Sequence, residues 1–188
     1  MECRGTGRAG AAGQAGFTLL ELMIAVGVLL FGLLGFSQAV LRSVATNEAT
    51  REGALAAEAA RQVLETLQAE TFGEVFRRYN AEPADDPGVA GTAPGSNFAV
   101  PGLTAQSSDA DGFVGRIEFP TVAIAPGVLR ENLALPAMGL PRDLNGDDFW
   151  DAADHSADYR LLPVVVRISW RGKAADSEAV FRTVLGNY

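Results

Sequence analysis

The fold is decided by the stretch Gly16-Phe17-Thr18-Leu19-Leu20-Glu21, which opens a run without charged side chains from Leu22 to Leu41. A helix needs about 20 apolar residues to cross a bilayer, and this run has that length. Glu21 alone interrupts the apolar start. A carboxylate at the centre of a membrane helix costs about 2.5–3.5 kcal/mol, so an acid in such a segment is expected to have a function. The stretch therefore predicts a transmembrane segment at about residues 17–41 with one functional acid.

The residues upstream form a short leader that carries two arginines among small and polar residues. A secretory signal places its cleavage site after the apolar segment, whereas here the small residue Gly16 precedes that segment. Cleavage after Gly16 would leave a helix that begins with a free amine on Phe17. In a bundle of staggered copies, Glu21 of one copy would neutralise the Phe17 amine of the next, and each charge would offset the desolvation of the other.

On these residues the chain resembles the type IV pilin family and its relatives, the pseudopilins of type II secretion. The resemblance implies that a membrane aspartic protease, the prepilin peptidase, cleaves after Gly16 and N-methylates the new amino terminus at Phe17. It also implies that Glu21 is needed for methylation or for docking of subunits. A plain signal anchor would explain the apolar run but not the order Gly-Phe-Thr-Leu-Leu-Glu.

The resemblance further implies a single-pass protein of the inner membrane whose head lies outside the cytoplasm and which later joins a pilus or pseudopilus. Its expected partners are the prepilin peptidase, other pilin or pseudopilin subunits that pack through the N-terminal helix, and the inner-membrane assembly platform. We expect an α+β, pilin-like fold, in which a long N-terminal helix with a membrane-spanning first half packs against a small antiparallel β-sheet.

Composition limits the other functions open to the chain. The single cysteine, Cys3, lies in the leader, so a processed chain would contain no disulfide and other contacts would have to hold its C-terminal region. The net charge of −8 and the scattered basic residues argue against nucleic-acid binding. The sequence after the leader contains no Gly-x-Ser-x-Gly motif and no phosphate-binding loop, and its one histidine has no evident nucleophile partner, so we expect no enzyme.

Helical periodicity continues beyond the membrane segment. No proline occurs from Ser37 to Ala69, and an apolar stripe runs among charged side chains. We therefore expect a cleaved leader (1–16), one long helix (17–70) and a soluble head (71–188). The 188-residue chain leaves room for one modest domain in that head. The stripe consists of Val40, Val44, Leu55, Ala59, Val63 and Leu67.

The head begins with an irregular middle and ends with a hairpin. Prolines and glycines concentrate in residues 82–96, which indicates a loop, and short strands are expected at 98–100 and 115–124, with Pro120 as a strand end or edge in the second. Alternating side chains predict a strand at 163–170 with one face on the long helix and the other, including Val165, turned outward. A polar loop and a returning strand at 179–185 would complete a hairpin over 163–185.

The acidic loop of residues 143–154 is the candidate ligand site. Compared with the calcium loop of an EF-hand, it has oxygen donors at the first, third, fifth, ninth and twelfth places. The match is partial, because the sixth place, a glycine in that motif, is Asp148, and the twelfth is an aspartate rather than the longer glutamate. The predicted ligands are Asp143, Asn145, Asp147, Asp151 and Asp154.

Carboxylates this close together repel one another unless a cation or water separates them. We therefore expect a calcium ion, as the one cofactor, to organise this loop and tie it to the hairpin, and a solvated acidic turn is the alternative. His155, the only histidine, is expected at the surface rather than as a ligand.

Three functions are consistent with these features. The favoured one is a minor pilin that primes or joins assembly of a type IV pilus, because the head is rich in loops. A minor pseudopilin of a type II secretion system is the close alternative. A membrane-anchored calcium-binding module that does not polymerise is the alternative of a different class.

Overall fold

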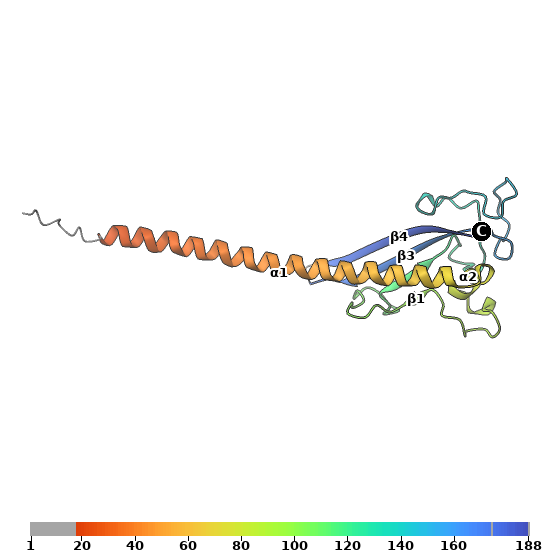
Figure 1. The fold of residues 1–188 in the computed structure, drawn as a ribbon, viewed down its shortest axis with the longest axis horizontal. Coiled ribbons are helices and arrows are strands. Elements are labelled where there is room, and N and C mark those ends of the chain that lie inside the picture. Colours follow the sequence, from red (N-terminus) through yellow and green to blue (C-terminus); the bar gives the residue numbers. More distant parts are fainter. Residues whose placement is uncertain (1–17, 174, 188) are drawn as a thin grey trace, which may run out of the picture. The chain divides into compact units, whose positions relative to one another are not determined.

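The computed structural model describes residues 18–173 and 175–187. Two helices precede an antiparallel sheet of four strands in the order β1-β2-β3-β4, which confirms the α+β class (Figure 1). The chain divides into two compact units, and the division falls between Val44 and Ala45. The α-helices and strands are α1 (Leu19–Ala69), α2 (Phe72–Tyr79), β1 (Asn97–Phe98), β2 (Gly115–Glu118), β3 (Leu161–Arg171) and β4 (Asp176–Gly186), and two short 3₁₀-helices are η1 (Pro83–Asp85) and η2 (Pro136–Met138).

In the first unit, α1 begins beside Thr18, whose side-chain oxygen accepts the backbone N–H of Glu21 at 3.2 Å. Such a bond satisfies one of the N–H groups that a helix start leaves without an intrahelical partner. The large apolar side chains from Leu19 to Val44 are 45–79% exposed. Among the described residues, α1 is the one helix long and apolar enough to cross a membrane, with a mean hydropathy of 2.5 over its most apolar 18 residues.

In the second unit, the later part of α1 packs into the core of the head. Ala56 and Ala60 lie one turn apart and are 0% and 1% exposed, and they share one apolar cluster with Val164 and Ile168 of β3. Residues four apart lie on the same side of a helix, so their small side chains form a flat stripe that a sheet can approach closely. The helix ends at Ala69, in agreement with the proline-free periodic pattern.

The C-terminal hairpin is the longest paired element of the sheet. β3 and β4 pair in unbroken register from Leu161 opposite Gly186 to Arg171 opposite Asp176, so the hairpin extends beyond the predicted range of 163–185 at both ends. The two short strands are shorter than expected: β1 is Asn97–Phe98 rather than 98–100, and β2 ends at Glu118 rather than at 124, in agreement with a strand end near Pro120. Pro120 lacks an N–H group and cannot continue a ladder.

The prediction that one face of β3 turns outward is wrong for Val165, which is only 2% exposed. β3 lies between β2 and β4, and Val165 stands directly between Glu118 and Arg182 in the two registers. Cross-strand neighbours lie about 5 Å apart, so their long side chains flank the valine on both sides. Arg167 also bridges to Glu118 at 2.7 Å on this face.

Helix α2 was not predicted from the sequence. Its residues Val75, Phe76 and Tyr79 are buried and follow helical spacing, while charged residues fill the positions between them. Tyr159, which precedes β3, binds the backbone of this helix: its hydroxyl donates to the carbonyl of Phe72 at 2.5 Å and accepts the N–H of Phe76 at 3.3 Å.

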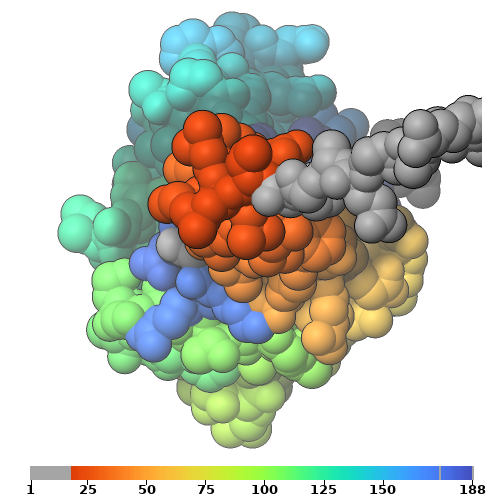
Figure 2. Space-filling model, turned by 90° about the vertical axis from the view of Figure 1, so that its left-hand side faces the viewer, coloured from red at the N-terminus to blue at the C-terminus, as the bar shows by residue number. Residues whose placement is uncertain are grey.

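Two contacts from the tip of the hairpin hold it on α1 without a disulfide. The indole N–H of Trp170 donates to Glu52 at 3.0 Å, and Lys173 forms an ion pair with Glu48. Within the head, the segment near residue 150 and the segment near residue 90 lie on opposite sides (Figures 1 and 2). The acidic loop is therefore separate from the proline-rich loop.

Candidate functional site

The amino-terminal motif is described only from Thr18 onward, so the predicted processing residues Gly16 and Phe17 lie outside the described residues. Glu21 lies in the first turn of α1 and is exposed. An acid in the first turn interacts favourably with the helix dipole. The docking role of Glu21 remains a prediction.

The acidic loop begins with a tight turn around Asp143. The carboxylate of Asp143 accepts the N–H groups of Gly146 at 2.6 Å and Asp148 at 2.8 Å, and these bonds hold its pKa below the ordinary value. Asp148 has a φ of 69°, in the left-handed region that non-glycine residues seldom adopt. The sixth place of the loop thus has the backbone conformation that favours the glycine of the calcium motif.

The next predicted ligands also accept bonds from their own backbone. Asn145 accepts the N–H of Asp147 at 3.1 Å through its side-chain oxygen, and Asp147 accepts the N–H of Phe149 at 2.9 Å. Asp154 accepts N–H groups from Leu129 at 3.1 Å and from Ser156. The bonds of Asn145, of Asp147 and of Asp154 with Ser156 define local turns, whereas the bond of Asp154 with Leu129 joins the loop to a distant segment.

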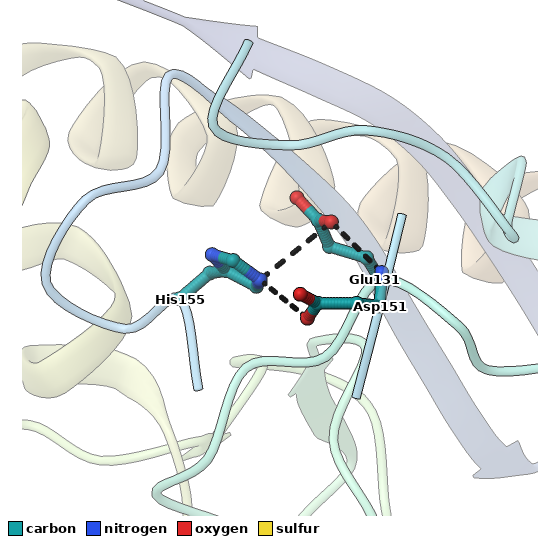
Figure 3. Close-up of side chains that lie close together, drawn as sticks. All are labelled: Glu131, Asp151 and His155. Carbon is teal, nitrogen blue, oxygen red and sulfur yellow. Dashed lines mark hydrogen bonds and ion pairs between the residues drawn. The ribbon is translucent and has the colours of Figure 1, made fainter. Parts of the chain in front are cut away.

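Of the four predicted aspartate ligands, only Asp151 belongs to a group of His, Cys, Asp or Glu donor atoms that converge within 4.8 Å in the described part of the chain, and its companions are Glu131 and His155 (Figure 3). Calcium binding by the predicted set therefore stays a prediction.

His155 is not a surface residue, contrary to the expectation from sequence. It is 5% exposed, and its backbone N–H donates to the carbonyl of Leu129 at 2.9 Å. Its ring nitrogens Nδ1 and Nε2 each lie 3.2 Å from a carboxylate oxygen, of Asp158 and of Asp151 respectively. Burial lowers the pKa of His155, but the bond to Asp151 and the charges of Glu131 and Asp158 outweigh it and raise the pKa above the ordinary value.

Glu131 is the functional candidate that the sequence did not indicate. It is 1% exposed, and its Oε1 accepts the N–H groups of Leu144 at 2.6 Å and Asn145 at 3.2 Å. Its Oε2 lies 3.4 Å from the N–H of Asp151 and 3.6 Å from Nε2 of His155. Glu131 therefore connects both ends of the acidic loop to a segment outside it.

Comparison with known proteins identifies the amino-terminal segment. Residues 12–37 match the family model of the prokaryotic N-terminal methylation motif. No curated protein and no solved structure matches the chain. The motif implies processing by prepilin peptidase and assembly with other pilin subunits, and together with the apolar helix it fits an inner-membrane-anchored structural subunit rather than an enzyme. The match covers the amino-terminal segment alone, and it supports a protein of the type IV pilin and pseudopilin family.

Proposed function

We propose that the protein is a minor pilin, processed between Gly16 and Phe17, that primes or joins assembly of a type IV pilus. The observation that carries this proposal is the methylation motif at residues 12–37, which runs directly into a helix whose apolar side chains are exposed. Such a surface is accommodated first by lipid and then by the helices of neighbouring subunits.

Packing and charge would both contribute to assembly. Lipid is as apolar as leucine, so helices in a membrane associate through close packing and polar contacts rather than through the hydrophobic effect. A Cβ atom added at Gly27, Gly32 or Gly35 would meet nothing within 4 Å in the single chain, so these glycines leave room for another helix to approach. The Glu21 carboxylate would then pair with the Phe17 amine of a neighbouring subunit and fix the stagger between the two helices.

The form of the head supports a minor subunit. Irregular segments separate α2 from the hairpin, and the hairpin is held on α1 by side-chain contacts such as the bond from Trp170 to Glu52. A minor pseudopilin of a type II secretion system is the second candidate, because the methylation motif is compatible with either machine.

Deletion of the gene followed by complementation tests the proposal. We expect deletion to remove surface fibres and twitching while protein export continues, and we expect the wild-type chain but not Glu21→Ala to restore both. Glu65→Ala is the matched control, because Glu65 is an exposed acid on the same helix within the head. A block in export with normal fibres would support the pseudopilin, and restoration by Glu21→Ala would refute the charge-pairing role.

A further inference from the structure

We propose that Glu131, Asp151 and His155 form a binding site for a divalent transition-metal ion of the zinc type. The ligands would be Nε2 of the imidazole and one oxygen of each carboxylate (Figure 3). This site differs from the predicted calcium loop, with which it shares only Asp151.

The distances suit a small ion. His155 Nε2 lies 3.2 Å from Oδ1 of Asp151 and 3.6 Å from Oε2 of Glu131. Zinc ligands stand about 2.0–2.2 Å from the metal in a tetrahedron, which places neighbouring ligand atoms roughly 3.3–3.6 Å apart. The remaining pair, Glu131 and Asp151, lies within 4.8 Å and can close by rotation of the exposed Asp151 side chain.

The second nitrogen of the imidazole is already held by a carboxylate. Nδ1 of His155 lies 3.2 Å from Oδ1 of Asp158, so an N–H on Nδ1 would still donate to Asp158 when Nε2, which faces the other two carboxylates, gives up its proton to bind a metal ion. Metal-binding histidines nearly always have such a partner on the other nitrogen, which fixes both the tautomer and the orientation of the ring. His155 is only 5% exposed, so the orientation of its ring is set by the fold.

The charges around Glu131 also favour a cation. Oε1 of Glu131 accepts two backbone N–H groups at 2.6 and 3.2 Å, whereas Oε2 has one backbone N–H, of Asp151, at 3.4 Å and lies 3.6 Å from Nε2 of His155. A buried carboxylate needs a close partner for its charge. A divalent ion between two carboxylates and a neutral imidazole would make the group electrically neutral.

The ligand types select the class of metal. Imidazole nitrogen suits zinc and its neighbours in the first transition series, while calcium takes six to eight oxygen ligands. Three protein ligands leave a fourth zinc position for water. Asp151, whose side chain is 60% exposed, opens the site to solvent on one side.

A metal ion here would reinforce a join between two distant segments. Residues 129–132 already bond to residues 151–155 through Leu129 with His155 and through Asn132 with Asp151. An ion bound to Glu131 of the first segment and to Asp151 and His155 of the second would hold the two segments together. In a processed chain without cysteine, such a link would stabilise the acidic side of the head.

The test uses the processed full-length protein, purified in detergent without a histidine tag and stripped with a chelator. Titration with zinc is followed by calorimetry, and cobalt serves as a spectroscopic probe of four-coordinate nitrogen and oxygen ligation. We expect about one zinc per chain, a higher melting temperature with zinc, and at least a ~10-fold loss of affinity in Asp151→Asn. His155→Gln should abolish the cobalt absorption band.

Two variants make the result decisive. Asp151→Asn changes an exposed side chain and keeps the oxygen that accepts the N–H of Ala153, so it should fold normally, which circular dichroism checks. Asp147→Asn is the matched control, since it alters the predicted calcium loop but not the zinc ligands. The inference is overturned if zinc does not bind, if zinc binds equally well to Asp151→Asn, or if only calcium binds and Asp147→Asn removes it.

Discussion

Substitution of Glu52 by alanine should weaken the attachment of the C-terminal hairpin to α1. Glu52 is half-buried and accepts the indole N–H of Trp170 at 3.0 Å, and Trp170 is only 5% exposed. After the substitution, that N–H would be buried without its partner. The ion pair of Lys173 with Glu48 would remain.

The expected loss of stability differs between the buried bond of Glu52 with Trp170 and the exposed ion pair of Glu48 with Lys173. A hydrogen bond to a charged group contributes about 1.5–3 kcal/mol, so Glu52→Ala should lower the free energy of unfolding by about that amount. For a chain of this size such a loss corresponds to a fall of roughly 3–12 °C in melting temperature. The side chain of Lys173 is 69% exposed, so removing its partner in Glu48→Ala should lower the free energy of unfolding by only about 0–1 kcal/mol.

The assay is thermal unfolding of the full-length protein in detergent, followed by circular dichroism and by the fluorescence of the two tryptophans. Glu52→Gln keeps an oxygen acceptor and should recover most of the loss, which separates the hydrogen bond from simple changes in packing. Equal losses in Glu52→Ala and Glu48→Ala would refute the reasoning, because the buried bond would then be no stronger than the exposed ion pair.

Three further predictions concern the head. Gly172→Ala should cost about 1–3 kcal/mol, measured by denaturant unfolding, because its Cβ would lie 2.6 Å from the carbonyl oxygen of Ala175; an unchanged midpoint would contradict the turn. Tyr159→Phe should cost about 1–2 kcal/mol in the same assay through the lost bond to Phe72, and a cost below roughly 0.5 kcal/mol would contradict it. Burial raises the pKa of Asp85 above its ordinary value of 3.8, so the folded protein takes up the proton at a higher pH than the unfolded chain does. The free energy of unfolding should therefore increase as the pH falls from the raised pKa to 3.8. Asp85→Asn should flatten that part of the plot of unfolding free energy against pH, and identical plots for the two proteins would contradict this assignment.

The elements with strong local patterns could be predicted from the sequence. The apolar run and the proline-free periodic stretch predict a long helix at residues 17–70, and α1 ends at Ala69, one residue earlier. Alternation around Val166 predicts the hairpin, because one buried face requires every second residue to be apolar. The motif from Gly16 to Glu21 predicted the type IV pilin and pseudopilin family, which the match of residues 12–37 to the methylation motif supports.

Features that depend on distant contacts could not be predicted in the same way. The burial of Val165 follows from its two neighbouring strands, and the burial of Glu131 follows from backbone donors at Leu144 and Asn145. A glutamate in an irregular segment carries no periodic signal that it will be buried. Helix α2 had a usable signal, since Phe72, Val75, Phe76 and Tyr79 have helical spacing, but its eight residues are too few to stand out beside the longer helix.

The most direct test of the central claim is the intact mass and amino-terminal peptide of the protein purified from its native membrane. The account predicts a chain that begins with N-methylated Phe17, from which the 16 leader residues have been removed. A chain that retains Met1, in cells whose prepilin peptidase processes its other substrates, would contradict it.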